Sequence, residues 1–195
     1  MPHAENPALP LGKRPLDIIL LVYFIFNLVA ISYLFDIEQI IITDVRHFTY
    51  PAWPPHAIVD LGHWWGNAFD PLLNARPVWW RATIWIDAVL FGPYYAFAIH
   101  AFIRRRNWIR LPSIIYASVM LTNVTIILSE EIWGLHATPH LANVIGANAS
   151  WIIAPALLIW RMRKEPFPEA QNAPRTAPAQ APRRSSRKVA RKRAV

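Results

Sequence analysis

The 195-residue chain contains no cysteine, which excludes disulfide scaffolds, zinc sites with thiolate ligands and cysteine nucleophiles. Charged residues are also scarce, at 16% compared with about 25% in a typical soluble domain. The chain lacks a phosphate-binding glycine loop, a G-x-S-x-G nucleophile turn and an H-E-x-x-H zinc motif. Apolar residues are abundant instead: hydrophobic residues make up 54% of the chain, and ten residues are tryptophan. This composition indicates a membrane protein.

The formal net charge of +8 does not indicate a nucleic-acid-binding protein, because of where the basic residues lie. Eight of the twenty Lys and Arg residues fall between Arg175 and Arg193, in a tail rich in Pro, Ala and Gln, and most of the others flank apolar segments. Such a tail cannot bury enough apolar surface to fold, so residues 166–195 are predicted to be disordered. We expect a membrane, and no nucleic acid, as the partner.

Four apolar segments each approach the roughly 20 residues that a helix needs to cross a bilayer. Each must be helical, because lipid offers the backbone no hydrogen-bond partner. The sequence therefore predicts an all-α membrane protein, a four-transmembrane-helix bundle, with a membrane domain at residues 16–165 after a short N-terminus at residues 1–15. The spans are expected at about residues 16–35, 82–103, 111–129 and 141–160.

The basic residues also predict the orientation of the bundle. With four spans, seventeen of the twenty Lys and Arg residues fall on the side that holds both termini. The opposite side holds only Arg46, Arg76 and Arg81. Because cytoplasmic segments carry the excess of Lys and Arg, both termini are expected to be cytoplasmic.

The longest connection, residues 37–81, carries five of the ten tryptophans. Tryptophan favours the boundary between headgroups and water, so this segment is expected to lie on or cap the non-cytoplasmic face, where it could act as a lid. The prolines Pro54 and Pro55 are followed by HAIVDLGHWWGNAF, a pattern that predicts a short helix starting after them.

Ionisable side chains within a span are costly, so each is a functional candidate. Asp87 lies five residues into the second expected span, and Asp36 closes the first in the stretch YLFDIEQ. A carboxyl group at such depth is expected to keep a proton, to share one with a second carboxyl group, or to pair with a ligand cation. Together with Asn123 and Asn148 in the last two spans, these groups indicate an intramembrane pocket.

Each polar residue also has a purely structural interpretation. Asp87 could reach interfacial water, Asp36 could cap a helix end, and the asparagines could join neighbouring helices by hydrogen bonds. The histidines His56, His63, His136 and His140 fall on the non-cytoplasmic side, but Pro139 breaks the helical spacing of His136 and His140, so no metal site is expected. No cofactor is expected either.

Five stretches of the chain form a recognisable set, which is YLFDIEQ, AFDPLLNARPVWW, IDAVLFGPYYAFAIHAF, NWIRLPSIIYAS and NASWIIAP. Together they resemble the EXPERA family of four-helix endoplasmic-reticulum membrane proteins, which includes the sigma-2 receptor and a sterol isomerase. The resemblance covers residues 16–163 and follows the order of the helices. It implies sterols, other lipids or cationic amphiphilic molecules as partners, and it favours a homodimer.

Carried over residue by residue, the resemblance implies roles for individual side chains. Asp36 corresponds to the first-helix acid that meets the ligand, and Asp87 to the second-helix acid that faces it. Asn148 and Trp151 correspond to a fourth-helix pair of the isomerase, where the indole could stabilise a carbocation. The sequence departs from the isomerase pattern at Ser32, where the isomerase has a histidine. The full set of expected ligand-binding residues is Asp36, Asp70, Asp87, Tyr116, Asn123, Glu130, Asn148 and Trp151.

Three functions follow as hypotheses. The first is a protein that binds sterols or hydrophobic amines in an acidic intramembrane pocket. The second is a cofactor-independent sterol Δ8–Δ7 isomerase, with Asp36 and Asp87 exchanging protons with the substrate. The third is a membrane trafficking adaptor that uses its basic tail. In a eukaryotic cell the resemblance implies the endoplasmic reticulum, and Lys192 with Arg193 resembles a dibasic retrieval signal.

Overall fold

The computed structural model describes residues 10–167, while residues 1–9 and 168–195 lie outside the described part. Between residues 10 and 167 all regular structure is helical and there is no strand, so the predicted all-α class is confirmed. The expected disordered tail, with the dibasic Lys192 and Arg193, falls almost wholly outside the described residues and stays a prediction.

Four helical stretches are long and apolar enough to cross a membrane, which confirms the predicted four-span class. Each expected span lies inside one of them. The first two stretches extend several residues further toward the long connection than the sequence suggested, so Asp36 lies within a helix rather than at its end. The four stretches are Pro15–Ile41, Val78–Arg104, Asn107–Trp133 and Leu141–Met162.

Two of the four spans are interrupted by π-helical segments, which we label η2 and η3. Three-residue 3₁₀ turns, η1 and η4, precede the first and third spans. The helical elements of the spans, in chain order, are η1 (Leu11–Lys13), α1 (Pro15–Phe26), η2 (Asn27–Phe35), α2 (Asp36–Ile41), α5 (Val78–Ile86), η3 (Asp87–Phe91), α6 (Gly92–Arg104), η4 (Asn107–Ile109), α7 (Arg110–Trp133) and α8 (Leu141–Met162).

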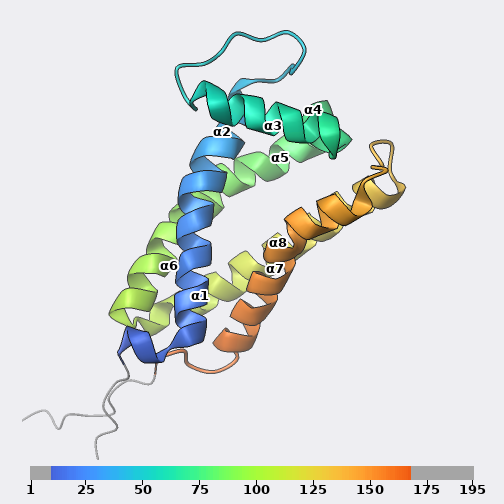
Figure 1. The fold of residues 1–195 in the computed structure, drawn as a ribbon. Helices are drawn as coiled ribbons and strands as arrows, with labels where there is room; N and C mark the ends of the chain where they lie inside the picture. Colours follow the sequence, from blue (N-terminus) through green and yellow to red (C-terminus); the bar gives the residue numbers. More distant parts are fainter. Residues whose placement is uncertain (1–9, 168–195) are drawn as a thin grey trace, which may run out of the picture. The chain divides into compact units, whose positions relative to one another are not determined.

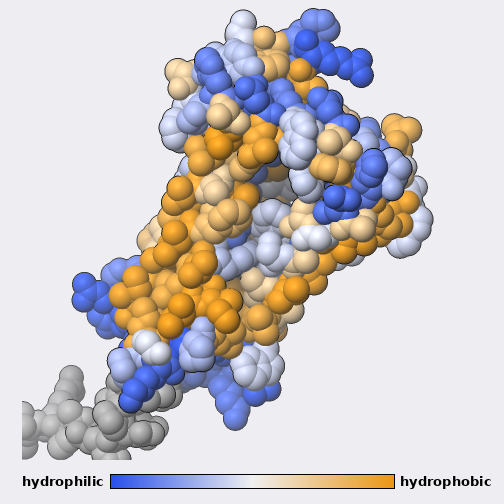
Figure 2. Space-filling view, viewed as in Figure 1, coloured by the Kyte–Doolittle hydropathy of each residue, from blue (hydrophilic) through white to orange (hydrophobic). Residues whose placement is uncertain are grey.

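The spans pack as neighbours in two pairs, α1 beside α6 and α7 beside α8 (Figure 1). Their outward sides form an apolar band, and hydrophilic residues gather toward both ends of the bundle (Figure 2). Exposed apolar side chains such as Val22, Val89 and Leu111 belong to this band. An apolar band of this kind matches the hydrocarbon interior of a bilayer.

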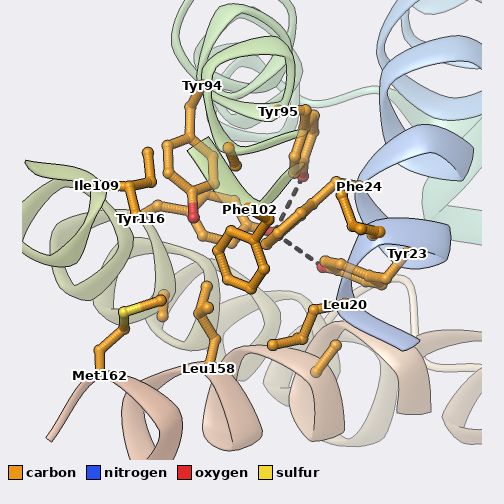
Figure 3. Close-up of a cluster of buried hydrophobic side chains, with 14 of the residues drawn as sticks. Leu20, Tyr23, Phe24, Tyr94, Tyr95, Phe102, Ile109, Tyr116, Leu158 and Met162 are labelled. Atoms are coloured by element: carbon orange, nitrogen blue, oxygen red, sulfur yellow. Dashed lines mark hydrogen bonds between the residues drawn. The ribbon is translucent and has the colours of Figure 1, made fainter. Parts of the chain in front are cut away.

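The interior of the bundle contains a cluster of buried aromatic and aliphatic side chains (Figure 3). Phe24 and Phe102 pack edge to face with ring centroids 5.4 Å apart. The hydroxyl group of Tyr116 shares hydrogen bonds with the hydroxyl groups of Tyr23 (2.8 Å) and Tyr95 (3.1 Å). These bonds satisfy buried polar groups and tie together α1, α6 and α7.

The long connection folds into two short helices, α3 (His56–Ala68) and α4 (Pro71–Ala75), which together we call the roof (Figure 1). Helix α3 starts directly after Pro55, as predicted. Helix α4 begins at Pro71 and is capped by Asp70, whose carboxylate accepts a hydrogen bond of 3.0 Å from the backbone N–H of Leu73.

A buried ion pair fastens the roof to the first span. The guanidinium group of Arg76, just after α4, donates hydrogen bonds of 3.0 and 2.9 Å to the two carboxylate oxygens of Glu38 in α2. His63 of α3 contacts the same carboxylate at 2.9 Å, and Arg76 also donates to the carbonyl of Ile42. We call Glu38, Arg76 and His63 the clamp, because it holds both roof helices against α2.

A second polar cluster lies at the opposite end of the first span. Asp17, which is buried, accepts hydrogen bonds from Arg14 (2.9 Å) and from Arg161 of α8 (2.8 Å). Both guanidinium groups lie over the ring of Phe167, at 5.4 Å from its centroid. This cluster explains how an acidic residue is accommodated beside the apolar run of the first span: its charge is paired with two cations.

Candidate functional site

A cavity of about 350 Å³ lies between the four spans and the roof. This volume falls within the range of small-molecule sites, and the wall is mostly apolar, with a few polar groups. The roof contributes Leu61, Gly62 and Trp65. The wall includes six of the eight residues expected from the sequence, which are Asp36, Asp70, Asp87, Asn123, Asn148 and Trp151.

The polar centre of the cavity is a pair of carboxyl groups from two different spans. Asp36 at the start of α2 and Asp87 at the start of η3 are only 4% and 8% exposed, and their carboxyl groups are direct neighbours. The hydroxyl group of Ser32 donates a hydrogen bond to Oδ1 of Asp87. Oδ2 of Asp36 is buried and has no hydrogen-bond partner among residues 10–167.

The π-helical segment η2 brings the polar residues of the first span onto one inner face. Within it each backbone N–H donates a hydrogen bond to the carbonyl five residues earlier, as the N–H of Asp36 does to the carbonyl of Ile31. A turn of about 4.4 residues aligns side chains five apart, which an ordinary α-helix would separate by about 140°. Asn27, Ser32 and Asp36 are accordingly all buried on the same side.

The second π-helical segment, η3, has a cause that can be read in the sequence. Pro93 has no N–H, and its ring opens the preceding helical turn. The N–H of Gly92 then donates to the carbonyl of Asp87, five residues back. Gly92 packs closely against η2, since a Cβ atom there would lie 2.8 Å from the hydroxyl oxygen of Tyr33. The two π-helical segments therefore meet beside the acid pair.

Trp151 of α8 is held in place from the first span. Its indole N–H donates a hydrogen bond of 2.7 Å to the side-chain oxygen of Asn27, whose amide group donates to the carbonyl of Tyr23 at 2.8 Å. The neighbouring Asn148 donates to the carbonyl of Val144 in its own helix. Since its N–H is engaged by Asn27, Trp151 presents the cavity with ring surface rather than a free donor.

Two of the expected residues do not line the cavity. Tyr116 lies in the buried tyrosine cluster beneath it. Glu130 is turned toward His136, whose Nδ1 lies 2.8 Å from its carboxylate, and is absent from the cavity wall. The adjacent Glu131 is fully buried instead, although the sequence offered no signal to prefer it.

Sequence reasoning also missed residues that contact the acid pair or close the wall. Ser32 stood out only as a departure from the isomerase pattern, yet it bonds directly to Asp87. Trp80 and Gln39 both line the cavity, and the indole N–H of Trp80 donates to the side-chain oxygen of Gln39 at 2.6 Å. Residues 10–167 contain no group of three or more His, Asp or Glu side chains arranged to hold a metal ion.

Asp70 closes the roof end of the cavity and lies outside the spans. Burial raises the pKa of its carboxyl group, while hydrogen bonds from the backbone N–H groups of Leu73 and Leu72 lower that pKa in part. The folded protein therefore binds the Asp70 proton more tightly than the unfolded chain does. This contribution to stability is complete below the unfolded pKa of about 3.9 and is lost as the pH rises through the folded pKa.

We expect Asp70→Asn to change how stability depends on pH. Asparagine keeps the helix cap but has no proton to lose. The thermal midpoint of the wild type should therefore fall relative to that of the variant as the pH rises from 3 to 7. Thermal unfolding of both purified proteins across this range checks the prediction, and a difference that does not vary with pH contradicts it.

The comparisons with known proteins identify a family and several relatives of this chain. The model of the EXPERA family, described as the EXPanded EBP superfamily, matches residues 57–162. The chain is 26% identical over 164 residues to sigma intracellular receptor 2 of Xenopus tropicalis, which covers 78% of this chain and 91% of the relative. It is 28% identical over 122 residues to the proteins of that name from Homo sapiens and Macaca fascicularis, covering 62% of this chain and 64% of each relative.

Proposed function

The chain belongs to the EXPERA family, and from this premise we propose that it binds a sterol or a hydrophobic amine in the cavity between its four spans. One observation carries the proposal: two buried carboxyl groups, Asp36 and Asp87, meet at a mostly apolar wall. In such a site the carboxyl groups bind the polar end of a ligand, and the apolar wall surrounds its hydrophobic body.

The acid pair favours a cationic ligand group over a neutral one. Two adjacent carboxylates repel each other when both are ionised, and a positive charge between them removes this repulsion. An ammonium group would place a positive charge between them and would satisfy Oδ2 of Asp36, which has no partner within the described residues. A charge-assisted hydrogen bond in a site with little water is roughly twice as strong as a neutral one.

The ligand would reach the cavity from the bilayer. A hollow opens on the outer surface between the first span and α8, in the middle of the apolar band (Figure 2). The first span and α8 both contribute to the cavity wall, through Ile31 on η2 and through Asn148 and Trp151 on α8. On the side of the polar connection, the roof and its clamp cover the cavity.

The surrounding topology completes the proposal. The sorting of basic residues supports a bundle with both termini in the cytoplasm and the roof on the opposite face. The membrane domain would then span residues 16–165, followed by the basic tail. Family membership supports an endoplasmic-reticulum location in a eukaryotic cell, and a homodimer stays a prediction.

Binding to the purified protein in lipid nanodiscs tests the proposed function. The ligands are a long-chain tertiary amine and a neutral analogue in which carbon replaces the nitrogen. We expect saturable binding of the amine, at least about 10-fold tighter than binding of the analogue, because only the amine forms the charge-assisted contact. Equal affinity of the two ligands would overturn the role of the acid pair.

Sterol isomerisation is a second candidate, favoured by the position of Trp151 on the same wall as the acid pair. The protonated carboxyl group would donate a proton to the sterol alkene, and the resulting carbocation would face the indole ring. A carboxylate would then remove a neighbouring proton, which completes the shift of the double bond. Incubation with a Δ8 sterol in heavy water separates the candidates: only isomerisation yields a deuterated Δ7 product, and Asp87→Asn should abolish it.

A further inference from the structure

Glu131, near the end of α7, has a buried carboxyl group with no function in the site described so far. The residue is 0% exposed, and within residues 10–167 neither oxygen of its carboxyl group has a hydrogen-bond partner. A buried carboxyl group without partners is costly, and native proteins satisfy nearly all buried polar groups. Its retention therefore points to a partner that arrives from outside the chain.

The position of Glu131 along α7 directs it to the roof end of the cavity. Val124 and Ile127 line the cavity, and Glu131 follows them by seven and four residues, so all three lie on one face of the helix. Glu130 is one residue before and faces away, toward His136. On the inner face of α7, Glu131 therefore lies one helical turn beyond Ile127, which lines the cavity.

The surroundings of Glu131 contain a second acid and a polar cover. Asp70, which lines the roof end of the cavity, lies near enough to Glu131 for the two carboxyl groups to interact through their charges. Above them, the hydroxyl group of Thr138 donates to the carbonyl of Phe69 at 2.6 Å, and its backbone N–H donates to the carbonyl of Glu131 at 2.9 Å. The loop after α7 is therefore bonded both to Glu131 and to Phe69, the residue before Asp70.

We propose that Asp70 and Glu131 form a second polar subsite, which takes a hydrogen-bond donor, preferably an ammonium group, at the far end of the ligand. This inference rests on the proposed function, in which Asp36 and Asp87 bind the first ammonium group. The preferred ligand is then an amphiphile with two polar ends joined by an apolar body. An organic cation fits better than a metal ion, because the described residues offer no third carboxylate or imidazole ligand there.

Three ligands with the same tertiary amine and the same apolar chain test the subsite. They differ only in the far end, which is an ammonium, a hydroxyl or a methyl group, and each is made in several chain lengths. At the best length we expect the ammonium ligand to bind at least about 10-fold tighter than the methyl ligand, with the hydroxyl ligand between them. A methyl ligand that binds as tightly as the others at every length overturns the subsite.

Two variants assign the effect to Glu131. Glu131→Gln has nearly the same size and should remove most of the gain from the ammonium end, while the affinity of the methyl ligand stays within about 2-fold of wild type. Glu130→Gln is the matched control and should keep the full gain, because the carboxylate of Glu130 is turned away toward His136. A gain that persists in Glu131→Gln contradicts the proposal.

The same experiment separates this inference from the proposed function. If the methyl ligand binds and the far end makes no difference, the second subsite fails and the proposed function stands. If none of the three ligands binds the wild-type protein, the proposed function fails, and the subsite fails with it.

Discussion

Asp36→Asn is expected to lower the affinity for a hydrophobic amine by at least about 30-fold. The asparagine has nearly the same shape, so the cavity keeps its volume, but the group that faces the ammonium no longer carries a charge. Removing one partner of a buried, hydrogen-bonded charge pair typically costs 2–5 kcal/mol, which is about 30-fold to several thousand-fold in affinity. Titration of the variant in lipid nanodiscs with the tertiary amine measures the loss.

The expected loss should be specific to the charge at this position. Asp44→Asn is the matched control, because Asp44 is exposed in the long connection and lies outside the cavity wall. It should bind the amine with wild-type affinity. The neutral analogue should bind the Asp36 variant about as well as it binds the wild type. An amine affinity near that of the wild type in Asp36→Asn would contradict the role assigned to this carboxyl group.

Arg76→Met is expected to give the largest loss of stability among single substitutions outside the core. Arg76 and Glu38 are both almost inaccessible to solvent, and among residues 10–167 the substitution leaves Glu38 with only His63 as a side-chain partner. Breaking a buried ion pair from one side costs about 3–5 kcal/mol. For a chain of this size this corresponds to a fall in the thermal midpoint of roughly 6–20 °C. Thermal unfolding in detergent measures it.

A double variant and a control show whether the clamp is responsible. Replacing both partners, as in Glu38→Leu with Arg76→Met, removes the unpaired charge and should recover most of the lost stability. Arg46→Met, at an exposed position of the same connection, should change the midpoint little. A thermal midpoint of Arg76→Met equal to that of the wild type would mean that the clamp does not hold the roof.

Several features of the fold could be predicted from the order of the residues alone. The four apolar runs predict four helical spans, because the bilayer imposes both the length and the helical bonding. Pro54 and Pro55 predict the start of α3, since proline favours the first turn of a helix. The depth of Asp36 and Asp87 within the runs singles them out, because a buried charge is costly wherever the helices pack.

The sequence alone could not predict which side chains line the cavity together. Glu130 and Glu131 are equivalent in the sequence, yet packing turns one toward His136 and buries the other completely. Tyr116 could equally have faced a ligand, but it pairs with two other tyrosines in the core. Arg76 resembles any basic residue of a connecting loop until the roof folds against α2 and buries it.

The sequence by itself determined the class of the protein, its four spans and the cost of its buried acids. Only the tertiary structure decided which side of each helix faces inward. Each residue turns an α-helix by about 100°, and a π-helical segment adds residues to the turn and rotates everything after it. Hydropathy shows how deep a residue lies but not its direction, so the meeting of Asp36 with Asp87 depends on two such segments packed against each other.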